Sequence, residues 1–121
     1  QTFTVQSRNI AGEIVSVTDS PDPVARGQKA TFTVTIKNTG NIIWQPMIRI
    51  KIYSIYGVAV DNTVTIDNIC PDMTYLHSFY WTPSLWLAKK GLYYYDVYLY
   101  QKGLIFSALL DSETGMTIQV T

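Results

Sequence analysis

The sequence predicts an all-β fold, an antiparallel β-sandwich of seven to nine strands with Greek-key connections, in a single domain over residues 1–121. Three observations predict it. Short segments alternate between apolar and polar residues with a period of two. Turn-forming residues recur at intervals of roughly 8–15 residues. Long stretches with the periodicity of a helix are missing from the sequence.

The N-terminal half of the chain contains the first predicted strands. Residues 1–10 are irregular, with a short alternating start that favours an edge strand or a frayed end. Residues 13–19 read as a strand, which the two prolines and two aspartates of residues 19–23 end in a turn. The cleanest strand is 29–38, KATFTVTIKN, followed by a turn at 38–41. Its expected inward residues are Ala30, Phe32, Val34 and Ile36.

The middle of the chain predicts three or four more strands. Residues 44–54 place Ile48, Ile50 and Ile52 on one face, with Arg49, Lys51 and Tyr53 on the other. Residues 58–66 form one broken strand or two short ones around Asp61, and 68–72 form a loop. Residues 74–81 alternate again and place Trp81 in the core beside Phe32, Val34 and Ile50. Residues 84–90, SLWLAKK, predict one helical turn.

The strongest strand signal is residues 91–106, GLYYYDVYLYQKGLIF. Aromatic and β-branched residues occupy both faces of this stretch. The face expected to enter the core carries Tyr93, Tyr95, Val97 and Leu99. The other face carries Leu92, Tyr94, Asp96, Tyr98 and Tyr100. Lys102 and Gly103 are expected to turn the chain into a last strand that begins at Leu104, bends at 111–115 and ends at 116–120.

The composition excludes several classes of function. Charged residues make up only 15% of the chain, its net charge is zero, and no basic run suggests nucleic acid. One cysteine excludes an internal disulfide framework and most zinc sites. The chain starts at Gln1 and lacks the long apolar run of a membrane span, so we expect that an N-terminal membrane anchor has been removed. With only nine carboxylates, the chain has few groups whose protonation in acid would destabilise the fold.

Three blocks of sequence carry a family resemblance. They are VARGQKATFTVTIKNTGN at 24–41, FYWTP at 79–83 and GLYYYDVYLYQKG at 91–103. In this order they resemble the CARDB domains, immunoglobulin-like domains of bacterial and archaeal surface proteins. The turn usually written LPPG in that family is replaced here by residues 69–72, ICPD. The resemblance implies an immunoglobulin-like sandwich that is not an enzyme.

Size, low charge and many isoleucines and tyrosines make the chain similar to a narrower family, the soluble domain of the archaellum accessory (stator) protein F. That resemblance implies a domain on the cell surface or in the pseudo-periplasm, membrane-anchored in the full-length protein. Its implied partner is a surface-layer or other envelope protein, and its implied role is to anchor a motility filament motor. A homodimer is a further possible partner.

Residues with reactive side chains do not form a catalytic set. Cys70 and His77 lack an orienting third group, so structural roles are expected for both. Asp96 is a lone carboxylate that could accept a bond from a tyrosine hydroxyl or pair with Arg49 or Lys51. Asp19 and Asp22 lack a third metal ligand, and Tyr93 is expected to make a structural tyrosine corner. No catalytic, cofactor or metal residues are therefore predicted.

The predicted interaction site is one face of the sheet. If the isoleucines of 44–54 and the inward residues of 91–101 face the core, their opposite sides lie together. This predicts an interface formed by Arg49, Lys51, Tyr53, Tyr94, Asp96, Tyr98 and Tyr100. It would bind a second copy or an envelope partner, unless a loop or the N-terminal segment covers it. The alternative function is a carbohydrate-binding module that uses exposed aromatic residues.

Overall fold

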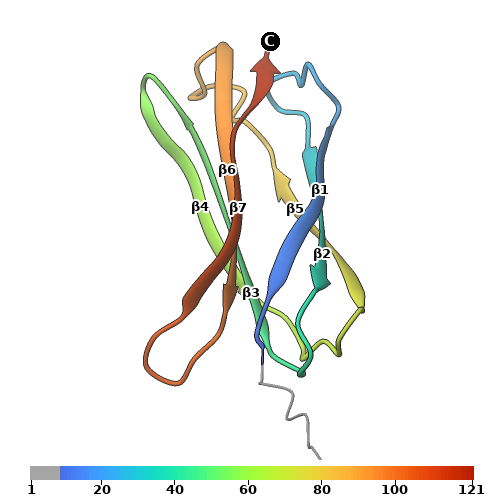
Figure 1. Ribbon diagram of the computed structural model, residues 1–121. Coiled ribbons are helices and arrows are strands. Elements are labelled where there is room, and N and C mark those ends of the chain that lie inside the picture. The colour runs from blue at the N-terminus through green and yellow to red at the C-terminus, as the bar shows by residue number, and fades with distance from the viewer. Residues whose placement is uncertain (1–8) are drawn as a thin grey trace, which may run out of the picture.

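Seven antiparallel strands form two sheets packed face to face (Figure 1). The computed structural model describes residues 9–121, so the edge strand considered for residues 1–10 falls almost wholly outside the described residues. The strands are β1 (Gly12–Ser20), β2 (Ala30–Asn38), β3 (Pro46–Ser54), β4 (Gly57–Thr65), β5 (Thr74–Trp81), β6 (Gly91–Gln101) and β7 (Ala108–Val120). The predicted all-β sandwich is confirmed.

The order of strands is β1-β2-β5 in one sheet and β4-β3-β6-β7 in the other. The chain changes sheets between β2 and β3, between β4 and β5, and between β5 and β6. After β1 it also crosses to the second sheet, where Val24 forms a parallel bridge with Val120 at the end of β7. The Val24 amide donates to the Gln119 carbonyl at 2.8 Å, and the Val24 carbonyl accepts from the Thr121 amide at 2.9 Å. These bonds join the two sheets along one side.

The core lies between the inner faces of β2, β3 and β6, as their alternation predicts. Because successive side chains of a strand point to opposite sides, every second residue of these strands is buried. The buried residues are Phe32, Val34 and Ile36 on β2, Ile48, Ile50 and Ile52 on β3, and Tyr95, Val97 and Leu99 on β6. The phenol of Tyr93 donates to the Lys89 carbonyl at 2.8 Å, which confirms the structural tyrosine corner.

The expected position of Trp81 in the core is wrong. Trp81 is the last residue of β5 and is only partly buried, with its ring tilted against Tyr93 at 5.1 Å. The buried tryptophan is Trp44, which precedes β3 and forms a bridge with Ile69. Alternation placed Trp81 on the correct side of β5, but the end of the strand lies at the open end of the sandwich.

The start of the last strand also differs from the prediction. Leu104, Ile105 and Phe106 lie in the β6–β7 loop, and β7 begins at Ala108. The expected bend at 111–115 is a shift of register inside one continuous strand. β4 is continuous through Asp61 as well, because it pairs with β3 along its whole length. The helical turn predicted at 84–90 is confirmed by the bond from the Ala88 amide to the Ser84 carbonyl, 3.1 Å. Within residues 9–121, no helix is long and apolar enough to cross a membrane.

Candidate functional site

The tyrosine face is the outer surface of β3 and β6, formed by Arg49, Lys51, Tyr53, Tyr94, Asp96, Tyr98 and Tyr100. The two strands are antiparallel neighbours, and their register sets Arg49 opposite Tyr98, Lys51 opposite Asp96 and Tyr53 opposite Tyr94. Tyr100 continues the row opposite Met47. The structure therefore brings together all seven residues that alternation places on this side. Cross-strand neighbours on one face interact directly.

Asp96 is the hydrogen-bonding centre of the tyrosine face. Only 8% of it is exposed, and its carboxylate accepts three bonds. The phenols of Tyr53 and Tyr98 each donate at 3.2 Å, and the amide of Gly115 on β7 donates at 2.8 Å. Burial raises the pKa of both phenols above 10.0, and the Asp96 charge raises it further. The sequence offered Asp96 two kinds of partner, a tyrosine hydroxyl or a basic side chain. The structure shows hydrogen bonds to tyrosine hydroxyls.

Arg49 pairs with Asp61 on β4 rather than with Asp96. Its guanidinium donates two bonds to that carboxylate, both 2.7 Å long. These bonds hold the pKa of Asp61 below its ordinary 3.8. The guanidinium also lies 5.7 Å from the centre of the Tyr98 ring, within reach of a cation–π contact. The Arg49 side chain thus links the tyrosine face to the neighbouring strand β4.

The tyrosine rings are held in place by one another. Tyr53 and Tyr94 stack across the two strands with ring centres 5.8 Å apart, and Lys51 lies 5.7 Å from the Tyr53 ring. Six of the seven residues keep part of their surface exposed, and Asp96 is the buried one. Within residues 9–121, no segment covers this face completely. The result is a half-exposed surface with ordered aromatic side chains.

The reactive residues outside the tyrosine face have structural surroundings. His77 packs edge-on against Phe79 at 4.7 Å, and burial lowers its pKa below 6.5. Cys70 is a free, exposed thiol in the loop before β5. Asp19 accepts from the Tyr95 phenol at 2.6 Å, and Asp22 accepts from the Gln119 amide at 3.1 Å. The part of the chain that the structure describes contains no group of three or more acidic, His or Cys side chains that could hold a metal.

The stability of the fold in acid depends on Asp61 and Asp19, two carboxylates whose pKa values are shifted in opposite directions. Asp61, whose pKa is lowered by Arg49, stabilises the fold above its unfolded pKa, and that contribution is lost as the pH falls through the folded value. Burial is the main cause of a raised pKa at Asp19, so the folded state binds a proton at this carboxylate more readily than the unfolded state does. The folded state therefore gains stability as the pH falls through this raised pKa. We therefore expect the domain to stay folded down to about pH 3.

Far-UV circular dichroism between neutral pH and about pH 3 tests this expectation. Asp61→Asn is the informative variant, because it removes the carboxylate that loses stability in this range. Its unfolding midpoint should depend less on pH than that of the wild type. A cooperative loss of β signal above about pH 4 in the wild type would contradict the account.

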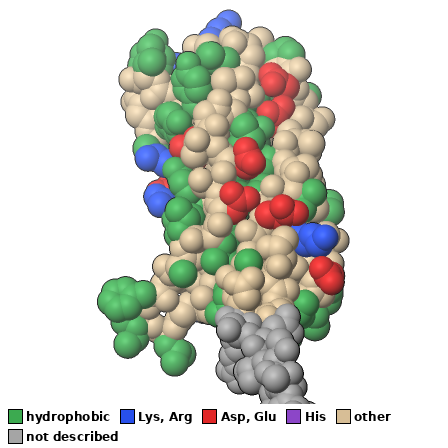
Figure 2. Space-filling model, in the orientation of Figure 1, with side chains coloured by type: hydrophobic (Ala, Val, Ile, Leu, Met, Phe, Trp, Pro, Cys, Tyr) green, Lys and Arg blue, Asp and Glu red, His purple; other side chains and the backbone are tan. Residues whose placement is uncertain are grey.

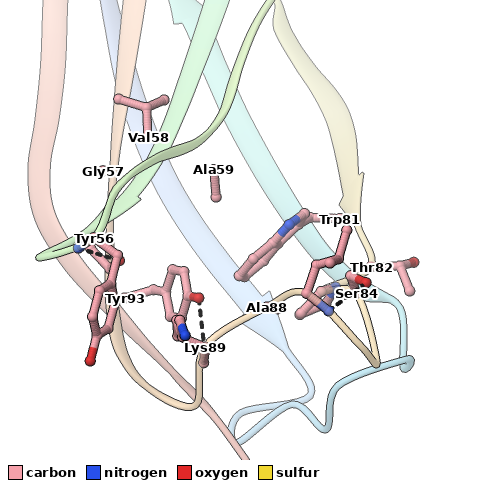
Figure 3. A pocket seen from close by; sticks show the side chains of 13 residues that line it. Tyr56, Gly57, Val58, Ala59, Trp81, Thr82, Ser84, Ala88, Lys89 and Tyr93 are labelled. Carbon is pink, nitrogen blue, oxygen red and sulfur yellow. Dashed lines mark hydrogen bonds between the residues drawn. The ribbon is translucent and has the colours of Figure 1, made fainter.

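A pocket that the sequence did not reveal opens at one end of the sandwich (Figure 3). Its volume is about 360 Å³, and it lies between the β3–β4 turn and the β5–β6 loop. Its aromatic walls are Tyr56, Trp81 and Tyr93, and hydroxyls of Thr82 and Ser84 also line it. The sequence signal closest to it is the apolar segment SLWLAKK at 84–90, which predicts only a helical turn.

The β6–β7 loop is a second apolar feature that alternation missed. Leu104, Ile105 and Phe106 form a protruding tip, visible as an apolar knob at the lower left of Figure 2. Phe106 is 86% exposed. An apolar run next to a turn predicts the start of a strand, whereas in the structure this run lies exposed at the tip of the hairpin.

Comparison with known proteins reveals a family match over most of the chain. The CARDB family model matches residues 13–105. Comparison with curated proteins finds no match. Among solved structures, the C-terminal domain of Wzt has a TM-score of 0.77 and 12% identity, covering 95% of this chain and 76% of that chain.

Two further solved structures extend the comparison. The CARDB domain of PF1109 from Pyrococcus furiosus, solved in complex with di-metal ions, has a TM-score of 0.61 and 19% identity, covering 100% of this chain and 95% of that chain. The cycloisomaltooligosaccharide glucanotransferase of Paenibacillus sp., complexed with cycloisomaltoheptaose, has a TM-score of 0.68 and 22% identity. That match covers 93% of this chain but only 14% of the enzyme. At such identities, structural similarity shows the fold alone.

Proposed function

The chain belongs to the CARDB family, and we propose that it acts in the cell envelope, outside the cytoplasm, as a non-catalytic module that binds another protein through its tyrosine face. CARDB domains are non-catalytic, immunoglobulin-like modules typical of extracellular proteins. The partner we propose is a surface-layer protein, and the role is to anchor a motility filament motor to that layer. A second copy of the chain is the other partner that this face would accept.

The observation that carries the proposal is the order of the tyrosine face. Tyrosine and arginine dominate protein interfaces, because they offer apolar area with a polar end. Here the phenols of Tyr53 and Tyr98 are fixed on Asp96, and the Arg49 guanidinium is fixed on Asp61. Side chains that are already ordered lose less conformational entropy on binding. This supports a docking surface that is formed before the partner arrives.

The double variant Tyr94→Ser, Tyr98→Ser tests the proposal. It removes two rings from the centre of the tyrosine face while the buried side of β6 stays intact. We expect the variant to fold and to lose dimerisation, binding to purified surface-layer protein, or both. Sedimentation measures the first and a pull-down the second.

The matched control is Leu76→Ser, Tyr80→Ser on β5, because these two apolar side chains are exposed on the outer face of the opposite sheet. The control should behave as the wild type does. Sedimentation and pull-down results equal to the wild type for a folded Tyr94, Tyr98 variant would show that this face is not the interface.

A carbohydrate-binding module is the second candidate, and the pocket favours it. Tyr56 and Trp81 supply rings on which a sugar could stack, beside the hydroxyls of Thr82 and Ser84. A glycan array separates the two candidates. Saturable binding to a simple oligosaccharide that Trp81→Ala abolishes would favour the carbohydrate function over protein docking.

A further inference from the structure

The end of the sandwich that holds the pocket is unusually apolar, and we call it the apolar pole. It consists of the β3–β4 turn, residues 54–58, and the β5–β6 loop, residues 82–90, which meet at the upper end of Figure 1. Ile55 is 87% exposed, Trp86 86% and Leu87 85%. Tyr56 and Leu85 are exposed beside them. Contiguous exposed apolar side chains usually mark a surface that binds something.

Hydrogen bonds hold the β5–β6 loop in the conformation that exposes these side chains. The Ser84 hydroxyl accepts from the amides of Trp86 at 3.3 Å and Leu87 at 3.1 Å. The Gly27 amide donates to the Pro83 carbonyl at 2.7 Å, and the Tyr93 phenol holds the Lys89 carbonyl. The loop is therefore fixed at both ends and in its middle. The exposure of Trp86 and Leu87 is built into the fold.

Four basic residues lie in or next to the apolar pole. Lys89 and Lys90 follow Leu87 after a single residue, Ala88, and both are exposed. Arg26 and Lys29 lie in the turn that packs against the same loop, where Gly27 faces the Leu85 side chain. Residues 23–29, 54–60 and 82–95 contain no aspartate or glutamate. The neighbouring carboxylate, Asp22, accepts from the Gln119 amide on β7. This end of the molecule thus combines exposed apolar loops with the exposed cations Lys89 and Lys90.

We propose that the apolar pole docks onto a lipid surface that carries anionic headgroups. Ile55, Trp86 and Leu87 would enter the boundary between headgroups and acyl chains, where tryptophan is favoured. Lys89 and Lys90 would extend back to the phosphates, since lysine can bury its stem and keep its ammonium among polar groups. Charge complementarity selects anionic lipid over a neutral protein surface. This surface is separate from the tyrosine face, so the inference stands independently of the proposed protein docking.

The pocket strengthens the assignment to lipid. It opens between the two loops of the apolar pole, and Lys89 lines it together with Ser84 and Thr82 (Figure 3). The Lys89 ammonium lies 5.9 Å from the centre of the Tyr56 ring, at the rim of this pocket. Hydroxyls and an ammonium beside aromatic rings suit a phosphate-bearing glycerol headgroup. The opposite tip at Leu104–Phe106 has only Lys102 as a neighbouring cation in the loop.

Vesicle co-sedimentation tests the inference. The chain should bind vesicles of phosphatidylcholine mixed with phosphatidylglycerol, bind phosphatidylcholine alone far more weakly, and dissociate as salt is raised. Trp86→Ser, Leu87→Ser should reduce binding by at least about tenfold, because the inserted area is lost. Lys89→Gln, Lys90→Gln should remove the preference for anionic vesicles, since each lysine near such a surface contributes several-fold.

The matched control is Leu104→Ser, Phe106→Ser at the opposite end, because Phe106 is as exposed as Trp86. It should bind as the wild type does. Brominated lipids should quench the tryptophan fluorescence of the wild type more strongly than that of Trp86→Phe, which keeps Trp81 in the pocket, and thermal melting confirms that each variant folds. The proposal would be overturned if the wild type did not bind mixed vesicles. It would also be overturned if the Trp86, Leu87 variant and the Leu104, Phe106 variant lost vesicle binding equally. Loss of vesicle binding only in the Leu104, Phe106 pair would overturn it as well.

Discussion

Replacing Phe32 with alanine is expected to lower the free energy of unfolding by about 3–5 kcal/mol. Phe32 is fully buried on β2, and its ring meets Tyr95 of the other sheet edge-on at 4.8 Å. The contact joins the two sheets at the centre of the core. Removing the ring leaves a cavity between strands that are fixed in sheets and collapse poorly. Urea unfolding followed by circular dichroism measures the loss.

Trp81→Ala is the comparison that makes the Phe32 result informative. Trp81 is the larger side chain, but it is partly exposed and lines the pocket, so its removal leaves a smaller closed cavity. We expect a smaller loss than for Phe32→Ala. A larger loss of unfolding free energy for Trp81→Ala than for Phe32→Ala would show that the core is centred nearer the open end of the sandwich.

Replacing Asp96 with alanine is expected to cost about 1.5–3 kcal/mol, the range for hydrogen bonds to a charged group. Two phenols and the Gly115 amide donate to this carboxylate, and alanine leaves all three without their acceptor. The change should also loosen the Tyr53 and Tyr98 side chains. Unfolding in urea gives the stability, and the near-ultraviolet circular dichroism of tyrosine reports their order.

Asp61→Ala is the control for the Asp96 variant, because Asp61 makes a bidentate pair at an exposed position. Exposed ion pairs contribute little to stability, so this variant should lose less than the Asp96 variant. Equal losses would mean that the carboxylate at position 96 does not organise the tyrosine face.

The sequence predicted the parts of the fold that depend on alternation. In β2, β3 and β6, isoleucine, valine or aromatic residues occupy every second position, and only one choice of face buries them. The same choice puts the residues of the tyrosine face on the outer side of the sheet. They lie side by side there because β3 and β6 are neighbours in the expected sandwich. The pairing of Tyr53 and Tyr98 with Asp96 follows from this register.

Alternation does not encode where a residue lies along the strand axis. It therefore placed Trp81 in the core, although the sandwich is open at that end. It also read Leu104–Phe106 as the start of a strand. In the structure, the backbone of Gly103 packs so closely against the Phe106 carbonyl that no Cβ would fit, and the chain turns there. Contacts between distant segments, such as Arg49 with Asp61, depend on a register that the sequence alone left open.

Site-specific photo-crosslinking tests most directly the claim that the tyrosine face is the docking surface. A benzophenone side chain in place of Tyr94 lies on this face, and the same group in place of Tyr80 lies on the outer face of β5. Each protein is irradiated alone and with purified surface-layer protein. We predict crosslinks to a second copy or to the surface-layer protein from position 94 and none from position 80. Crosslinks from position 80 alone, or equally from both positions, would contradict the account.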